Sequence, residues 1–318
     1  RNSRIESNTA VDGGGILNDS TLFIYDSELA NNEASSLGGG LENNAVAVLV
    51  GVTVNNNSAV NYGGGLDNNQ GDLLVINSEI RGNESPNGGG IAQFNGDTKI
   101  VNTLFSGNVA TNNGGAIQYE GDDDTTSSLY IVNSTISGNY AQNNGGGIYT
   151  SAAGDTTAEN SVLYNNTANN GNGDDLRVTS STNPALLKSS AYGDTSGLVN
   201  TSNALPLSAG QAANLFIEPL DPSSTPDDFN GDFRLKPGSV LINSGDSGLG
   251  DDTLLPDEST LGISNTPLDI DRDGIDDPID VDIEGNTRQV NGPVDMGAYE
   301  YQGPFCFVQD SNGTIHTA

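Results

Sequence analysis

Short apolar runs separated by polar residues fill the first half of the chain, and their spacing is not that of an amphipathic helix. The clearest runs are rich in Val, Ile, Leu, Phe and Tyr, which favour β-strands, and they cover residues 22–25, 46–50, 73–76 and 129–132. The pattern therefore predicts a series of short strands.

A glycine triplet divides these strands into repeats. Along the chain it begins at Gly13, Gly38, Gly63 and Gly88, returns as the variant Gly114-Gly115-Ala116, begins again at Gly145, and fades into Gly171-Asn172-Gly173. The steps between these starting points are 25, 25, 25, 26, 31 and 26 residues. An aliphatic residue directly follows each complete triplet and the Gly114-Gly115-Ala116 variant: Ile16, Leu41, Leu66, Ile91, Ile117 and Ile148. An apolar residue stands three places before an asparagine in the pairs Leu29 and Asn32, Val54 and Asn57, Ile80 and Asn83, Phe105 and Asn108, Ile136 and Asn139, and Val162 and Asn165.

A period near 25 residues with glycine corners predicts an all-β fold, a right-handed parallel β-helix or solenoid, over residues 1–220 and regular to about residue 175. The aliphatic columns would stack into an inner core. The asparagines would form a ladder at a bend, because Asn tolerates left-handed backbone and its amide both donates and accepts hydrogen bonds. A propeller or a sandwich would instead show longer blades or antiparallel hairpin turns at the repeat spacing.

The sequence Phe105-Ser106-Gly107-Asn108, followed by Gly114-Gly115-Ala116-Ile117, resembles the paired FxxN and GGA[ILV] signatures of polymorphic outer membrane protein repeats. The resemblance covers about residues 1–175. It implies a surface-displayed bacterial β-helix of a kind that includes several adhesins.

The chain starts inside a coil, because residues 4–8 repeat the apolar-x-x-Asn element just before the first triplet. An open first coil presents unpaired strand edges. We therefore expect an upstream segment or a capping partner at the Arg1 end, or copies stacked end to end into a filament.

Residues 221–318 are expected to form an irregular C-terminal domain rich in Asp, Gly and Pro. Four blocks resemble, in order and spacing, the choice-of-anchor Q domain: GDFRLKPGS at 231–239, INSGD at 242–246, NTR at 286–288 and VDMGAYE at 294–300. That resemblance implies a secreted bacterial protein in which a β-helix precedes this block and a variable surface-sorting tail. Residues 304–318 lack a recognisable sorting motif.

The balance of 42 acidic against 10 basic residues, a net charge of -32, makes nucleic acid and anionic membranes improbable partners. No apolar stretch approaches the roughly 20 residues that cross a bilayer. The single cysteine, Cys306, has no intramolecular partner for a disulfide.

The sharpest local signal is an acidic loop that resembles the twelve-residue calcium loop. Oxygen ligands for Ca²⁺ would come from Asp269, Asp271, Asp273, the Ile275 carbonyl, Asp277 and Asp280, with Gly274 at the turn. Asp280 replaces the usual bidentate Glu, and Pro278 opposes an exiting helix, so we expect an isolated calcium loop. Much of the negative charge lies in this part of the chain, and bound Ca²⁺ would reduce its repulsion.

Parallel β-helices also support polysaccharide lyases and glycoside hydrolases, so catalysis has to be considered. The repeats offer only Arg81 and Lys99 as interior basic residues, in different columns, and the sole histidine is His316. Carboxylate pairs and the exposed run Asp122-Asp123-Asp124 stay open as an alternative. Tyr62, Tyr119, Tyr130, Tyr140, Tyr149 and Tyr164 could stack on sugars, but they do not share one column.

These observations predict an extracellular, cell-surface bacterial β-helix with a structural or adhesive role, stabilised by calcium and without catalytic residues. Its partners would be surface glycans or other copies of itself. The alternatives are a polysaccharide lyase or glycoside hydrolase on the same scaffold, and a subunit of an extracellular filament.

Overall fold

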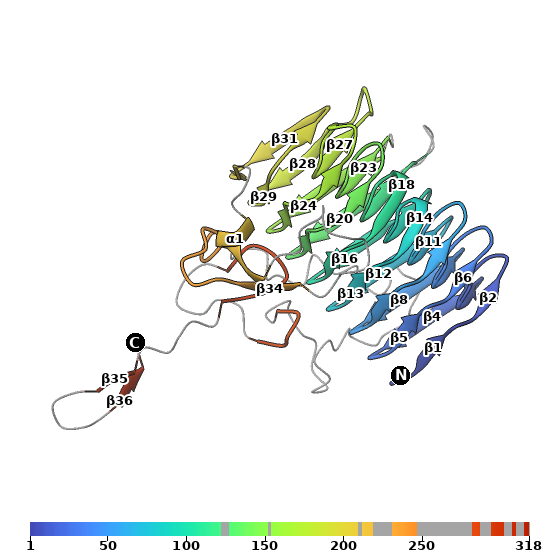
Figure 1. The fold of residues 1–318 in the computed structure, drawn as a ribbon, viewed down its shortest axis with the longest axis horizontal. Helices are drawn as coiled ribbons and strands as arrows, with labels where there is room; N and C mark the ends of the chain where they lie inside the picture. Colours follow the sequence, from blue (N-terminus) through green and yellow to red (C-terminus); the bar gives the residue numbers. More distant parts are fainter. Residues whose placement is uncertain are drawn as a thin grey trace.

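A computed structural model of the chain describes residues 1–121, 127–151, 154–208, 212–218, 231–246, 282–286, 294–301, 307–309 and 315–317. As predicted, the repeats form a parallel β-helix whose coils stack one on another (Figure 1). Seven coils carry four strands each, one in each of four sheets that we name A to D, and a shorter eighth coil has no strand in sheet B.

Sheets A and B hold the first two strands of each coil. Sheet A contains β1 (Arg4–Glu6), β5 (Glu28–Ala30), β9 (Thr53–Asn55), β13 (Glu79–Arg81), β17 (Leu104–Ser106), β21 (Thr135–Ile136), β25 (Val162–Leu163), β29 (Ala191–Tyr192) and β32 (Leu205–Pro206). Sheet B contains β2 (Thr9–Ala10), β6 (Glu33–Ala34), β10 (Ser58–Ala59), β14 (Glu84–Asn87), β18 (Val109–Asn113), β22 (Tyr140–Ala141) and β26 (Thr167–Ala168).

Sheets C and D complete the coils. Sheet C contains β3 (Ile16–Asn18), β7 (Leu41–Asn43), β11 (Leu66–Asn68), β15 (Ile91–Gln93), β19 (Ile117–Tyr119), β23 (Ile148–Thr150), β27 (Leu176–Val178) and β30 (Thr195–Ser196). Sheet D contains β4 (Thr21–Tyr25), β8 (Val46–Val50), β12 (Asp72–Ile76), β16 (Thr98–Val101), β20 (Ser128–Val132), β24 (Asp155–Glu159), β28 (Ala185–Lys188) and β31 (Val199–Ser202).

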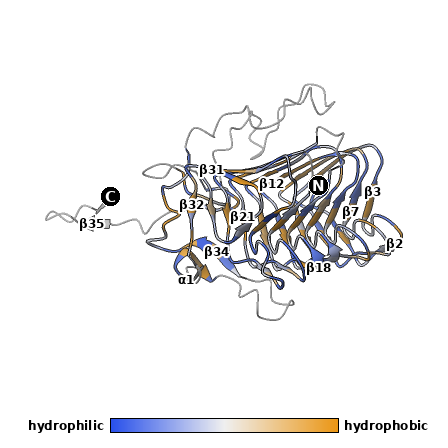
Figure 2. Cartoon of the chain, turned by 90° about the horizontal axis from the view of Figure 1, so that it is seen from above, coloured by the Kyte–Doolittle hydropathy of each residue, from blue (hydrophilic) through white to orange (hydrophobic). Residues whose placement is uncertain are grey.

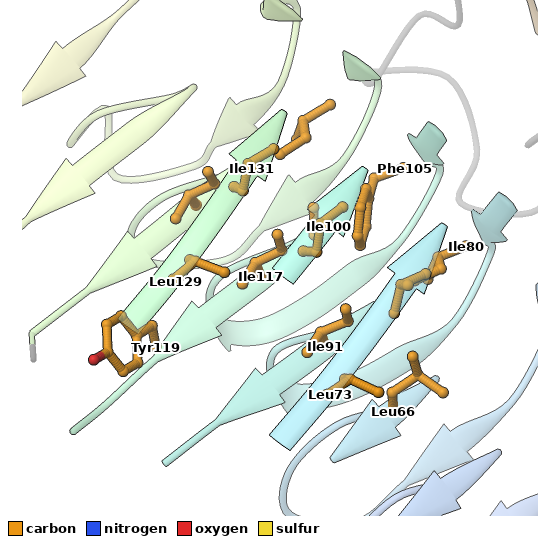
Figure 3. Packing of buried hydrophobic residues seen from close by; sticks show 14 of the residues in the cluster. Leu66, Leu73, Ile80, Ile91, Ile100, Phe105, Ile117, Tyr119, Leu129 and Ile131 are labelled. Carbon is orange, nitrogen blue, oxygen red and sulfur yellow. The ribbon is translucent and has the colours of Figure 1, made fainter. Parts of the chain in front are cut away.

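The core is a set of aliphatic columns, because the parallel register keeps equivalent residues of successive coils in line. In sheet C the column after the glycine triplets runs Leu41, Leu66, Ile91, Ile117 and Ile148. Sheet A adds Leu29, Val54, Ile80, Phe105 and Ile136, and these side chains meet those of sheet D inside the coil (Figure 3). Figure 2 shows the resulting alternation of hydrophobic and hydrophilic positions along the strands. Each fully buried aliphatic side chain stabilises the fold by about 1.5–3 kcal/mol.

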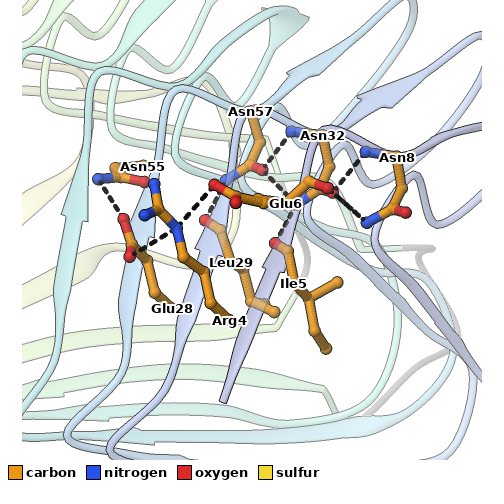
Figure 4. Close-up of polar contacts among 9 residues, drawn as sticks. All are labelled: Arg4, Ile5, Glu6, Asn8, Glu28, Leu29, Asn32, Asn55 and Asn57. Carbon is orange, nitrogen blue, oxygen red and sulfur yellow. Dashed lines mark hydrogen bonds and ion pairs between the residues drawn. The ribbon is translucent and has the colours of Figure 1, made fainter. Parts of the chain in front are cut away.

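The predicted asparagine ladder is present. In each step the backbone N–H and the side-chain Nδ2 of one asparagine donate to the Oδ1 of the next, as in the pair Asn32 and Asn57 at 2.9 and 3.0 Å (Figure 4). The ladder runs through Asn8, Asn32, Asn57, Asn83, Asn108, Asn139 and Asn166.

Two details of the predicted ladder are wrong. The left-handed backbone belongs to the residue before each ladder asparagine, such as Asn31, Asn56 and Gly82, so the ladder asparagines contribute only their amides. The last pair is Leu163 and Asn166, not Val162 and Asn165, because β21 pairs with β25 with Ile136 opposite Leu163. Asn165, at a φ of 67°, occupies the left-handed position of that coil.

Residues 231–246 and 294–301 of the acidic C-terminal block pack on the outer face of sheet A. Its strand β34 (Asp232–Leu235) pairs antiparallel with β33 (Phe216–Glu218), which precedes the block and follows the short helix α1 (Ala212–Leu215). The Phe216 and Phe233 rings, 5.5 Å apart, belong to a second apolar cluster that also includes Leu104, Val162 and Met296. A separate antiparallel pair is formed by β35 (Phe307–Gln309) and β36 (Ile315–Thr317).

Candidate functional site

The predicted calcium ligands Asp269, Asp271, Asp273, Ile275, Asp277 and Asp280 all lie outside the described residues, as do Asp122, Asp123 and Asp124. Within the described part of the chain, no group of three Asp, Glu, His or Cys side chains surrounds one point as ready-made metal ligands. The calcium loop therefore stays a prediction.

The interior basic residues lie apart, as expected. Arg81 lies on β13 of sheet A, where its guanidinium is 2.7 Å from the Glu79 carboxylate, and Lys99 lies on β16 of sheet D. The tyrosine side chains also lie in different environments. Tyr119 is fully buried and donates its hydroxyl to the Ser127 carbonyl at 2.6 Å, whereas Tyr164 is buried beneath the last coils.

A pocket of about 370 Å³ opens where the seventh coil meets the shortened eighth. Its lining includes Tyr164, Leu207 and the three carboxylates of Asp174, Asp175 and Asp194. Burial raises the pKa of Asp174, and the nearby Asp194 carboxylate raises it further against a backbone hydrogen bond from Ala168. The pocket thus concentrates negative charge in a concave site, which sequence reasoning did not identify.

Asp175 closes the asparagine ladder at this pocket. Its Oδ1 accepts from the Asn166 N–H at 3.0 Å and from Asn166 Nδ2 at 2.7 Å, the two bonds that a further ladder asparagine would accept. Its Oδ2 accepts from the Asp194 N–H at 2.9 Å. The carboxylate therefore takes the place of an eighth asparagine and caps this end of the ladder.

The glycine spacing does not reveal that Asp175 caps the ladder. The glycines at 171 and 173 suggest that the seventh triplet begins at residue 171, which is two residues too early. Ile148 pairs with Leu176, and the Gly145 N–H donates to the Asn172 carbonyl, so Gly173 is the equivalent of Gly145. The seventh motif is Gly173-Asp174-Asp175, which puts Asp175 at the third glycine position. In the preceding coil a Cβ on Gly147 would meet Asn166 Nδ2 at 3.0 Å, so a side chain at the third position reaches the ladder.

Asp175 should make stability depend on pH. Burial raises its pKa to about 7, against about 3.9 in an unfolded chain, so the folded state holds the proton more tightly. The stabilisation is fully present below about pH 4 and is lost as the pH rises through 7. Asp175→Asn keeps the Oδ1 acceptor but turns an amide donor towards the Asp194 N–H, which costs stability at every pH. On top of that constant loss, we expect the variant to gain up to about 4 kcal/mol relative to wild type as the pH rises from 4 to 8. Urea denaturation across this range measures it, and parallel profiles for the two proteins would contradict it.

The described residues of the four blocks with choice-of-anchor Q resemblance, together with Leu241 and Asp282 between them, lie close together on sheet A. The Met296 N–H donates to the Leu241 carbonyl at 3.1 Å, and the Gly245 N–H donates to the Val294 carbonyl at 2.8 Å. The Glu300 N–H donates to Asp282 Oδ2 at 2.9 Å, and Asn286 N–H donates to the other Asp282 oxygen at 2.8 Å. Residues 287 and 288 lie outside the described part of the block.

The same blocks are tied to the solenoid by polar contacts. The Ala298 N–H donates to Thr135 Oγ1 at 3.0 Å, and the Gly297 N–H donates to the Asn160 carbonyl at 2.7 Å. Asn160 also accepts from the Asp246 N–H at 2.7 Å through its side chain. These contacts therefore attach the block to the sixth coil and to the turn that leads into the seventh.

The opposite end of the solenoid is open. Strands β1, β2, β3 and β4 each pair with a neighbour on one side only. The core residues Ile5, Ile16 and Leu22 are only partly buried there, and Leu17 and Phe23 are 50% and 40% exposed. Asn8 donates to the ladder, but no described residue donates to its Oδ1 (Figure 4). This edge has the hydrogen-bonding groups and apolar surface that another coil would cover.

The fold is a parallel β-helix, and two of its coils contain segments that match a known family of repeats. The Chlamydia polymorphic membrane protein (Chlamydia_PMP) repeat matches residues 102–120 and 133–151. These segments contain β17 to β19 and β21 to β23, which are the sheet A, B and C strands of the fifth and sixth coils. The repeat is thus similar to one found in bacterial surface proteins, as the FxxN and GGA[ILV] signatures indicated.

A comparison with curated proteins finds no match to the chain. The family match does not extend to residues 221–318, so the choice-of-anchor Q resemblance stays a prediction. In the described part of the chain, no helix is both long and apolar enough to cross a bilayer.

Proposed function

We propose that this chain is a β-helix with a structural or adhesive role, displayed at a bacterial cell surface and without catalytic activity. The observation that carries the proposal is the unbroken stack of seven coils, whose core columns and ladder are built by the same repeat that matches the polymorphic membrane protein family. Such a stack forms a stiff rod with long lateral faces, which suits the display of binding surfaces away from a cell.

The two ends of the rod suit different roles. At the Arg1 end, Asn8 Oδ1 and the free strand edges are compatible with a preceding coil, whether from an upstream segment or from a capping partner. Towards the other end, Asp175 of the seventh coil ends the asparagine ladder beneath the eighth coil, so the last coil offers no ladder amide to the Asn8 end of another copy. This cap disfavours end-to-end stacking of identical copies, so the filament is the weaker alternative.

Calcium is part of the proposal through the loop at residues 269–280. Its alternating aspartates provide hard oxygen ligands, and the net charge of -32 gives bound cations a stabilising role. The ligands proposed are Asp269, Asp271, Asp273, Ile275, Asp277 and Asp280.

A polysaccharide-degrading enzyme is the second candidate, favoured by the pocket that holds Asp174, Asp175 and Asp194. Paired carboxylates are the catalytic groups of most glycoside hydrolases. Asp175, however, is held by three N–H donors at the end of the ladder, which supports a structural role for it.

A glycan array combined with a reducing-end assay separates the two candidates. For the adhesive β-helix we expect defined glycan binding without release of reducing ends. Cleavage of a bound polysaccharide that disappears in Asp194→Asn, with the fold intact by circular dichroism, would replace adhesion with catalysis. Absence of any glycan binding would leave only the structural role.

A further inference from the structure

Two acidic side chains lie in register on the outer side of sheet C but are shielded from solvent. Glu42 of β7 pairs with Asp67 of β11, and their flanking residues Leu41 and Leu66 face the core. Alternation along a strand therefore directs Glu42 and Asp67 outward. Even so, Asp67 is 0% exposed and Glu42 is 5% exposed.

The turn before each glycine triplet supplies the cover. Gly63 has a φ of 63°, and a Cβ there would lie 2.8 Å from the Asp67 Cα, so this turn folds directly back over the strand. The preceding residue, Tyr62, packs its ring edge against Phe94 with the ring centres 4.8 Å apart. Burial raises the pKa of Tyr62, and the negative charges of Glu120 and Asp67 raise it further.

The buried carboxylates have oxygens that no hydrogen bond satisfies. These are both oxygens of Asp67, Oε2 of Glu42 and Oδ1 of Asp12, which lies before the first glycine triplet. Burial, with the charges of Glu42 and Asp12, raises the pKa of Asp67 to about 8. None of the ion pairs of the described residues includes these three acids.

A buried carboxylate without a partner destabilises a fold by several kcal/mol, so a ligand on these oxygens would stabilise the protein. One proton on Asp67 would supply a single donor and leave the other oxygens unsatisfied. A single cation interacts with several oxygens at once and neutralises both charges. Because the available ligands are all oxygens, the matching class is a hard divalent cation.

We propose that Glu42 and Asp67 bind one divalent cation of calcium type beneath the Tyr62 turn, with Asp12 at the margin of the site. The two carboxylates come from adjacent coils, so the cation joins the second coil to the third. This site is independent of the predicted loop at residues 269–280.

Isothermal titration of chelator-treated protein with CaCl₂ tests the proposal. We expect Asp67→Asn, which keeps the side-chain shape, to lose one equivalent of bound Ca²⁺ or to weaken it at least tenfold. Asp271→Ala serves as the matched control, because it removes a ligand of the C-terminal loop and should leave the solenoid equivalent unchanged. Glu42→Gln should reproduce the Asp67→Asn result, so a folding defect in one variant does not decide the outcome.

Unchanged Ca²⁺ stoichiometry and affinity in both folded solenoid variants would overturn the proposal. The solenoid site is also rejected if Asp67→Asn raises the thermal midpoint equally with and without Ca²⁺, since the pair would then hold a proton. Loss of binding only in Asp271→Ala would support the loop alone and would likewise reject the solenoid site.

Discussion

Replacing Asn108 by alanine should lower the free energy of unfolding by about 3 kcal/mol or more, because it leaves several buried polar groups without partners. Asn108 is 0% exposed. Its Oδ1 accepts from the N–H and Nδ2 of Asn83 at 3.1 and 3.0 Å, and its Nδ2 donates to the Ile80 carbonyl at 2.8 Å. Its Nδ2 also donates to Asn139 Oδ1 at 2.9 Å, so the substitution opens the ladder in both directions.

Asn8→Ala is the matched control, since Asn8 is the same residue type in the same ladder but lies at the open edge. It loses only the Nδ2 bonds to the Glu6 carbonyl and to Asn32 Oδ1, in an exposed setting. We expect a change of about 1 kcal/mol or less. Urea denaturation followed by circular dichroism measures both variants, and equal midpoints would show that the interior ladder has no special role in stability.

The solenoid could be predicted because the sequence pattern that specifies one coil recurs in every coil. Parallel stacking puts residues one period apart into contact, so the columns of Leu41, Leu66 and Ile91 are visible in the sequence before they are seen in space. The repeat also predicts the ladder. The choice of ladder residues fails at the last step, where Asn165 and Asn166 are adjacent and the period no longer decides which amide reaches Asn139.

The attachment of the C-terminal block could not be predicted in the same way. Ala298 and Thr135, joined by a hydrogen bond, are 163 residues apart, and no periodicity relates them. A weak signal existed in sheet A, whose outward residues change from Glu28 and Glu79 in early coils to Leu104 and Val162 in later ones. An apolar outer face requires a cover, and the block provides it.

The candidate sites show a similar limit. Strand alternation correctly directs Glu42 and Asp67 outward, but outward residues are expected to meet solvent. Their burial depends on the turn at Tyr62 and Gly63, which folds back over the strand. The alternation of inward and outward residues along the strand gives no sign of this turn. In the sequence these two acids therefore look like part of the general negative surface charge, although both are buried.

The second position of the glycine triplet should tolerate no side chain. A Cβ on Gly89 would lie 2.5 Å from the Gly115 carbonyl oxygen and 2.5 Å from the Val109 carbonyl oxygen. Both are backbone atoms of the next coil, so relief requires separation of stacked strands. We expect Gly89→Ala to destabilise the protein by about 3 kcal/mol or more, or to prevent soluble expression.

Gly90→Ala, one residue later, is the internal control for Gly89→Ala. The fifth coil already carries alanine at this third position, where Ala116 is fully buried and its carbonyl accepts from the Ile91 N–H at 2.8 Å. A Cβ on Gly90 would approach one backbone oxygen, that of Ala116, at 2.6 Å, whereas a Cβ on Gly89 would meet two, and its next neighbours are side-chain atoms of Asn108 and Ile80 at 3.3 Å. We expect a change of about 1 kcal/mol, and thermal denaturation of the two variants side by side measures the difference. Equal losses would mean that the triplet is selected for backbone flexibility; a loss confined to Gly89→Ala would mean that the close approach of coils at its second position sets the glycine requirement.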